Sequence, residues 1–215
     1  GQPFNVEAYG YLPRFINGKN VSYAVGDASQ AYSSKAEKQQ TGLTKFRRYL
    51  LFLHPDILFV YDELEADHPA KWSWLIHSPY KIKIDELKDQ FYCSSSKVTA
   101  TTSLFSSQKF HWQLSDTFGV PAVNWLGRED EDGNLIEYKN DQWHLTAATV
   151  DKSNKARFLA IMRINPNGKM KTETSAEQFN DKNEVTIDGW VIHAELGPSK
   201  PALLEAFNAE KHIAF

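Results

Sequence analysis

The stretch from residue 44 to residue 65 constrains the fold most, because two long apolar runs flank a turn at His54-Pro55-Asp56. Apolar side chains occupy both alternating faces of each run, which is typical of strands that are covered on both sides. We therefore predict a β-hairpin at the centre of a sheet, covered by a second sheet or by another domain.

The turn residues also predict how the two strands of this hairpin pair. Proline at position 55 suits the second position of a type I turn and not the positive φ of a tight two-residue turn, which favours a four-residue loop from His54 to Ile57. A ladder that paired Leu53 with Ile57 would instead reverse the face assignments of one strand. The predicted cross-strand pairs are Leu53 with Leu58, Leu51 with Val60 and Tyr49 with Asp62 on one face, and Phe52 with Phe59, Leu50 with Tyr61 and Arg48 with Glu63 on the other.

Short β-rich runs separated by turn residues recur along the chain. This pattern predicts an all-β fold, an antiparallel multi-stranded β-sandwich, and we expect residues 1–215 to form a single domain. In the last run, Asp188-Gly189 predicts a two-residue hairpin turn. The predicted strands cover residues 21–25, 46–53, 57–64, 71–77, 98–104, 109–114, 143–150, 158–164 and 184–193.

Few segments favour a structure other than a β-strand. Residues 174–179 and 199–209 could form short helices, and residues 115–141 are predicted to be a long surface excursion. This excursion contains the acidic run Glu129 to Asp132, but its spacing does not match a calcium-binding EF-hand loop, so a solvated loop is the simpler interpretation.

Composition excludes several classes of protein. With 24 basic and 27 acidic residues and no basic cluster, the chain lacks the footprint of a nucleic-acid-binding protein. No apolar run approaches the roughly 20 residues of a membrane helix. The single cysteine, Cys93, excludes an internal disulfide and is interpreted as a small buried residue in a strand.

Alternation along residues 72–77 places Trp72, Trp74 and Ile76 on one face of a strand and Ser73, Leu75 and His77 on the other. An exposed tryptophan could stack on a sugar ring, but tryptophans more often pack in a core. His77 could bind a metal or act as a base. A zinc site needs three or four ligands, and a base needs a positioned partner, so a structural histidine is the simpler interpretation.

Asp27 follows a strand, and its carboxylate can accept hydrogen bonds from backbone N–H groups two residues on. The chain contains no HxH or HExxH pair, no glycine-rich phosphate loop and no GxSxG elbow. A complete nucleophilic or metal-dependent site is therefore not expected from these residues.

Four segments, taken in order, resemble the C-terminal β-sandwich of the heparinase II/III-like polysaccharide lyases. They are VSYAVGDASQAY at 21–32, FRRYLLFLHPD at 46–56, FVYDEL at 59–64 and WLIHS at 74–78. The resemblance covers about residues 1 to 80, and the remainder shows only compatible all-β character.

The resemblance implies a parent enzyme that cleaves uronate-containing acidic polysaccharides by β-elimination, in the periplasm or after secretion. In the family, the base and the carboxylate neutraliser lie in an N-terminal helical toroid domain and in the first strands of the sandwich. The His and Asp metal ligands of the family also precede the region that this chain resembles. Gly1-Gln2 resembles a Gly-Gln pair that follows those ligands. This segment is thus expected to hold no catalytic residue, metal ligand or cofactor, whereas the full-length protein could bind a divalent metal such as zinc.

Asp27, His77 and Trp74 are the candidates for substrate binding within this segment. Two alternatives remain open from the sequence. One is a non-catalytic carbohydrate-binding module with a tryptophan platform, which a buried Trp74 would disfavour. The other is a structural or dimerisation domain, which an exposed apolar patch would favour.

Overall fold

A computed structural model describes residues 9–32, 42–117, 127–136, 142–166, 183–209 and 212–214. Its strands pair antiparallel in three sheets, which confirms the predicted antiparallel all-β architecture. The largest sheet has eight strands in the order β1-β2-β3-β4-β11-β8-β7-β6. Its strands are β1 Tyr11–Asn17, β2 Val21–Asp27, β3 Leu43–Leu53, β4 Ile57–Ala70, β6 Ile82–Asp85, β7 Gln90–Ser94, β8 Val98–Ser106 and β11 Ser153–Pro166.

Two smaller sheets accompany the large one. A three-stranded sheet has the order β5-β10-β9, and a four-stranded sheet has the order β12-β13-β14-β15. Their strands are β5 Ser73–Ser78, β9 Phe110–Ser115, β10 Trp143–Thr149, β12 Glu184–Ile187, β13 Trp190–Ala194, β14 Leu204–Phe207 and β15 His212–Ala214. The described helical turns are α1 Ser29–Tyr32 and the 3-10 turn Glu86–Lys88.

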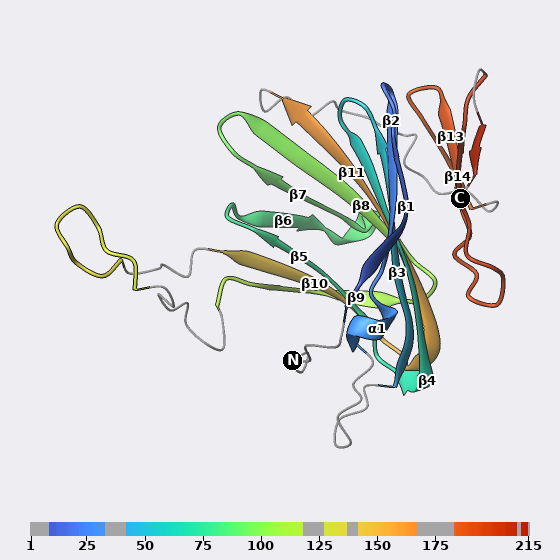
Figure 1. Cartoon of the computed structure of the whole chain (residues 1–215), viewed down its shortest axis with the longest axis horizontal. Coiled ribbons are helices and arrows are strands. Elements are labelled where there is room, and N and C mark those ends of the chain that lie inside the picture. Colours follow the sequence, from blue (N-terminus) through green and yellow to red (C-terminus); the bar gives the residue numbers. More distant parts are fainter. Residues whose placement is uncertain are drawn as a thin grey trace.

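The two small sheets pack on opposite faces of the large sheet (Figure 1). One apolar cluster joins β2, β3, β4 and β11 to the four-stranded sheet, with Leu51, Phe59 and Ile161 facing Ile187 and Ile192. The large sheet is therefore the central layer, and the hairpin β3–β4 lies inside it as predicted.

A second cluster fills the space under the three-stranded sheet. It contains Val60, Phe158 and Phe91 from the large sheet together with Trp74 and Leu145 from the small one. Val60 and Phe59 are neighbours on β4 yet belong to different clusters, as expected when alternate side chains point to opposite faces. Strand β4 is consequently buried on both faces, which explains its nearly continuous apolar sequence.

The predicted register of the β3–β4 hairpin is wrong by one residue. Leu53 pairs with Ile57, and the ladder continues through Leu51 with Phe59 and Tyr49 with Tyr61, so the loop has three residues and its His54–Pro55 peptide is cis. The observed register places Arg48 opposite Asp62 and Arg47 opposite Glu63. Opposite charges therefore face each other across the strands, and every β4 side chain lies on the face opposite to the one predicted.

The cover over the large sheet is incomplete at its β1 edge. Phe15 pairs with Ala24, Ala24 with Leu50 and Leu50 with Val60, so these side chains share the face that carries the three-stranded sheet. Val60 is buried there, but Phe15 is 62% exposed and Leu50 is 36% exposed. We call this region, formed by Leu12, Phe15, Leu50 and Phe52, the open apolar face.

Several smaller expectations can now be compared with the structure. The turn at Asp188-Gly189 is confirmed, with φ of 48° and 79° between β12 and β13. The helix expected over residues 199–209 is wrong, since β14 forms there and pairs with β13. Cys93 lies in β7 and is half-buried, so the strand is confirmed and full burial is not.

Two expectations concern segments that are described incompletely or not at all. The helix suggested for residues 174–179 and much of the excursion at residues 115–141 lie outside the described residues. In the described parts of that excursion, residues 115–117 and 127–136 are exposed. None of the helices in the described ranges is long and apolar enough to cross a membrane.

Candidate functional site

Asp27 ends β2, and the short helix α1 begins two residues later. The backbone N–H of Ser29 donates a hydrogen bond to Oδ1 of Asp27 over 3.0 Å, which confirms the predicted bond from an amide two residues on. Arg47 Nε donates to Oδ2 over 2.7 Å, and the Tyr11 hydroxyl donates to the same oxygen over 3.2 Å. The carboxylate thus connects three segments of the chain.

Asp27 is one end of a row of alternating charges across four neighbouring strands. Asp27 pairs with Arg47, Arg47 with Glu63 and Glu63 with Arg157, on β2, β3, β4 and β11 respectively. Asp27, Glu63 and Arg157 are buried, whereas the Arg47 side chain is 41% exposed. Burial of so many charges is tolerated because each has partners of opposite charge or hydrogen-bond partners.

Glu63 is held by two further side chains from β3. Lys45 Nζ donates to its Oε1 over 3.1 Å, and the Tyr49 hydroxyl donates to its Oε2 over 3.2 Å. Burial, followed by the negative charge of Glu63, raises the pKa of Tyr49. Tyr49 therefore stays protonated at neutral pH and is poorly suited to act as a base.

The environment keeps Asp27 ionised. Burial alone would raise its pKa, but hydrogen bonds from Ser29 and Arg47 and the charge of Arg47 outweigh burial and lower the pKa to about 2. The hydrogen bond that Arg47 donates to Asp27 raises the pKa of the Arg47 guanidinium, although desolvation acts to lower it. At neutral pH Asp27 is a fixed anion that orders its neighbours, and it is not a proton donor.

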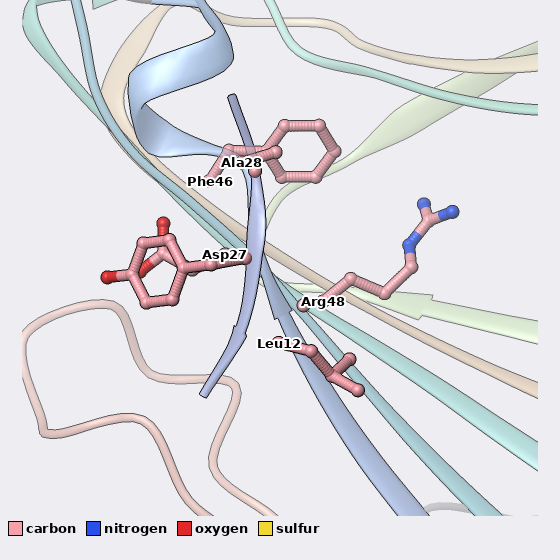
Figure 2. Close-up of a pocket in the computed structure, with 8 residues that line it drawn as sticks. Leu12, Asp27, Ala28, Phe46 and Arg48 are labelled. Atoms are coloured by element: carbon pink, nitrogen blue, oxygen red, sulfur yellow. The ribbon is translucent and has the colours of Figure 1, made fainter. Parts of the chain in front are cut away.

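A shallow groove of about 420 Å³ opens beside this row. In Figure 2, Asp27 and Arg48 point away from each other, while Leu12 and Phe46 form part of the apolar lining. Arg48 forms a bidentate ion pair with Asp62, and both hydrogen bonds are 2.7 Å long. The Asp62 carboxylate therefore already balances the charge of Arg48. The groove is lined by Gly10, Tyr11, Leu12, Gly26, Asp27, Ala28, Phe46 and Arg48.

Trp74 lies in the core under the three-stranded sheet. Its side chain contacts the Phe91 ring, with centroids 6.1 Å apart, and the residue is only 5% exposed. A buried indole has no free ring face on which a pyranose can stack. The structure therefore assigns Trp74 to core packing, which is the alternative interpretation from the sequence.

His77 lies on the opposite face of the same strand, as the alternation predicted, and this face is exposed. It pairs directly with His144 on β10, and the two ring centroids are 5.0 Å apart. Sequence reasoning missed His144 because it is far away along the chain and no local motif joins the two histidines. The candidates Asp27, Trp74 and His77 thus occupy three separate environments and do not form one site.

The chemistry that these residues support is structural and electrostatic. Within the row Asp27 pairs with Arg47, whereas Glu63 pairs with Lys45 and Arg157 donates to backbone carbonyls. Arg47 and Tyr11 form the exposed rim of the row. Among the described residues, no group of three or more His, Cys, Asp or Glu side chains is arranged to hold a metal. The row is therefore suited to holding β2, β3, β4 and β11 together and to contacting polar or anionic groups at its rim.

Comparison with solved structures identifies where this fold occurs. The structure of the heparinase III BT4657 gene product with methylated lysines matches with a TM-score of 0.57 and 12% identity, over 96% of this chain. Heparan sulfate lyase HepC from Pedobacter heparinus matches with a TM-score of 0.51 and 13% identity, over 94% of this chain. This chain has a heparinase III-like β-sandwich fold.

The heparinase III-like fold accounts for only part of those enzymes. The match covers 27% of the heparinase III chain and 29% of the HepC chain. No protein-family model matches the sequence, and none of the curated proteins matches it. The likeness therefore rests on three-dimensional structure, and it agrees with the resemblance carried by the four sequence segments.

Proposed function

We propose that this chain is the C-terminal β-sandwich part of a lyase that cleaves uronate-containing acidic polysaccharides by β-elimination. The observation that carries the proposal is the match of nearly the whole chain to structures of heparinase III and heparan sulfate lyase. In this proposal the base, the group that neutralises the uronate carboxylate and any zinc ion belong to the rest of the protein.

The electrostatics of the charged row support this division of labour. β-Elimination needs a base that can remove the C5 proton and a donor or cation that stabilises the resulting charge. Tyr49 has a raised pKa, and the low pKa of Asp27 makes its carboxylate a weak base. Neither is suited to proton removal at neutral pH, so we assign both to the framework of the sandwich.

The open apolar face supports a partner domain. A contiguous set of exposed apolar side chains on a sheet face commonly marks a contact with another domain or subunit. We propose that the N-terminal part of the enzyme, a helical toroid domain, packs on this side of the sandwich. The same face also favours the alternative of a structural or dimerisation role, whereas the buried Trp74 gives no support to a tryptophan-platform binding module.

Acidic polysaccharide is the proposed substrate of the whole enzyme, and the periplasm or the extracellular space is its proposed location. The exposed rim of the charged row offers Arg47 and Tyr11 for contact with such a chain. This contact would orient substrate and is not needed for the chemical step.

The test compares this chain with the longer polypeptide encoded by its gene. Each is incubated with heparan sulfate, heparin and alginate, and the ultraviolet absorbance of unsaturated uronate is followed. We expect product only from the longer polypeptide. Circular dichroism of the isolated chain serves as the control for folding.

Turnover by the folded isolated chain would contradict the absence of a catalytic base from this segment. A gene that encodes no further domain, or a longer polypeptide with no activity on any of the three substrates, would contradict the proposed lyase function.

A further inference from the structure

His77 and His144 form a cross-strand pair on the outer face of the three-stranded sheet. They are direct partners in the β5–β10 ladder, and Trp74 and Leu145 point to the buried face from the same two strands. His77 is exposed and His144 is half-buried. The sheet thus fixes both imidazoles on its outer face, where His77 is open to ions in solution. The Nε2 atom of His144 is buried, so this ring has to turn outward to present it to an ion.

The separation of the two rings fits a shared metal ion. Metal–nitrogen bonds of about 2.0 to 2.1 Å put each imidazole centroid about 3.2 Å from the ion, so ligand angles of about 90° to 109° separate the centroids by about 4.5 to 5.2 Å. The observed separation is 5.0 Å, with 38° between the ring planes. The spacing of the two strands therefore fits a shared ion once the rings turn so that one nitrogen of each points toward it.

We propose that His77 and His144 bind a divalent transition-metal ion of the class that prefers imidazole, such as Cu²⁺, Ni²⁺ or Zn²⁺. Two protein ligands leave the remaining coordination positions to water or to an oxygen of a bound molecule. No local motif predicts a metal in this segment, because the pairing of distant strands creates the site. Ser115, which pairs with His144 on β9, lies on the same face, and its hydroxyl is already hydrogen-bonded to the backbone of Thr117.

The site is also independent of the proposed lyase chemistry. Two histidines on neighbouring strands form a weaker and more open site than the closed three- or four-ligand sites of structural zinc. An ion held there would cross-link β5 to β10 and would raise the melting temperature, because it binds only when the two strands are paired. The predicted affinity order follows the general preference of nitrogen sites, with Cu²⁺ bound most tightly.

The experiment titrates the purified chain, without a polyhistidine tag, with Cu²⁺, Ni²⁺ and Zn²⁺ in a buffer that does not chelate metals. Calorimetry should show one saturable site, and electron paramagnetic resonance of the Cu²⁺ form should show coupling to two imidazole nitrogens. In His77→Ala and in His144→Asn we expect at least tenfold weaker binding and coupling to one imidazole nitrogen.

His111→Ala is the matched control, because His111 lies on the same sheet and hydrogen-bonds to Gln113 over 3.0 Å. It should leave the affinity and the two-nitrogen signal unchanged. Apo melting curves show whether each variant is folded, and exposed His77 makes His77→Ala the safer of the two site variants. Absence of saturable binding to the folded wild type, or unchanged binding by folded His77→Ala, would overturn the proposal.

Discussion

Among single residues, Asp27 accepts hydrogen bonds from three donors, which belong to Tyr11, Ser29 and Arg47. Burial opposes the charged form of the carboxylate, but the bonds from Ser29 and Arg47 and the charge of Arg47 outweigh burial and lower its pKa from 3.8 to about 2. Because the folded protein binds this proton less readily than the unfolded chain does, the stabilisation is complete above about pH 4 and is lost as pH falls toward 2.

We expect Asp27→Asn to remove this pH dependence. In the wild type the shift contributes about 2 kcal/mol to the free energy of unfolding near pH 5, and this contribution falls as the pH decreases toward 2. Urea unfolding at pH 5 and pH 2.5 measures the effect. The difference in stability between wild type and variant should shrink at the lower pH, and a constant difference would contradict the ion-pair account.

Arg157 connects the large sheet to the loop that precedes β14. Its guanidinium donates to the carbonyls of Glu195 and Gly197, each over 2.9 Å, and to that of Lys200 over 2.6 Å. The planar fork of arginine can serve several acceptors at once, whereas one ammonium group cannot. The docking of the four-stranded sheet therefore depends on this side chain.

Arg157→Lys should lower the free energy of unfolding by about 2 to 4 kcal/mol, because it leaves buried carbonyls without donors. Urea unfolding measures the loss, and hydrogen exchange should show weaker protection in β13 and β14. Lys155→Ala is the control on the same strand. Its exposed ion pair with Glu65 should contribute less than about 1 kcal/mol, so equal losses from both substitutions would refute the assigned role of Arg157.

Among the secondary-structure elements, the β12–β13 hairpin depends on its turn. Gly189 has φ of 79°, a conformation that an L-residue with a Cβ adopts at a cost, although no neighbouring atom lies within 4 Å of the point that an added Cβ would occupy. Gly26 lies in a strand without a positive φ, and the nearest atom to an added Cβ is the Arg48 carbonyl oxygen at 4.0 Å. An added Cβ would have space at both glycines, so the two positions differ in backbone conformation only.

Gly189→Ala should destabilise the chain by about 1 to 2 kcal/mol, while Gly26→Ala should change its stability by less than about 0.5 kcal/mol. Thermal unfolding followed by circular dichroism compares the two variants. Equal melting temperatures for both would contradict the left-handed turn at Gly189.

The sequence predicted most strands because their alternation and turn residues are local signals. It did not predict the register of β3 and β4, because a three-residue loop and a four-residue loop both accommodate Pro55. Local composition also favoured a helix where β14 forms, but pairing with β13 and burial of Leu204 and Ala206 decide the structure there.

The same limit applies to the candidate site. The bond from Ser29 to Asp27 is local and could be predicted, whereas the contact with Arg47 depends on the register between β2 and β3. His144 beside His77 depends on the pairing of β10 with β5. Burial of Trp74 was the commoner outcome for its residue type, and the strand alternation alone could not tell which face would be covered.

At the scale of the whole molecule, the layers have unequal widths. Eight strands form the central sheet, and the open apolar face extends beyond the three-stranded sheet over β1 to β3. Leu12 and Phe15 are 58% and 62% exposed there. In the proposed full-length enzyme, this face contacts the remainder of the polypeptide.

Phe15→Ser should therefore leave the melting temperature of the isolated chain nearly unchanged and reduce its self-association, because the substitution removes exposed apolar surface. In the longer polypeptide the same substitution should lower the melting temperature. Sedimentation and thermal unfolding provide the two measurements. Phe59→Ser, at a fully buried position, should destabilise both proteins, and an unaffected longer polypeptide carrying Phe15→Ser would contradict the proposed contact.

The central claim is that this sandwich belongs to an enzyme that breaks its polysaccharide by β-elimination. The most direct measurement is the mass and ultraviolet spectrum of the oligosaccharides that the longer polypeptide releases from heparan sulfate. Elimination predicts products that absorb as unsaturated uronates and are lighter by one water than the corresponding hydrolysis products. Saturated products with the mass of hydrolysis, or no products from a folded enzyme on heparan sulfate, heparin or alginate, would contradict it.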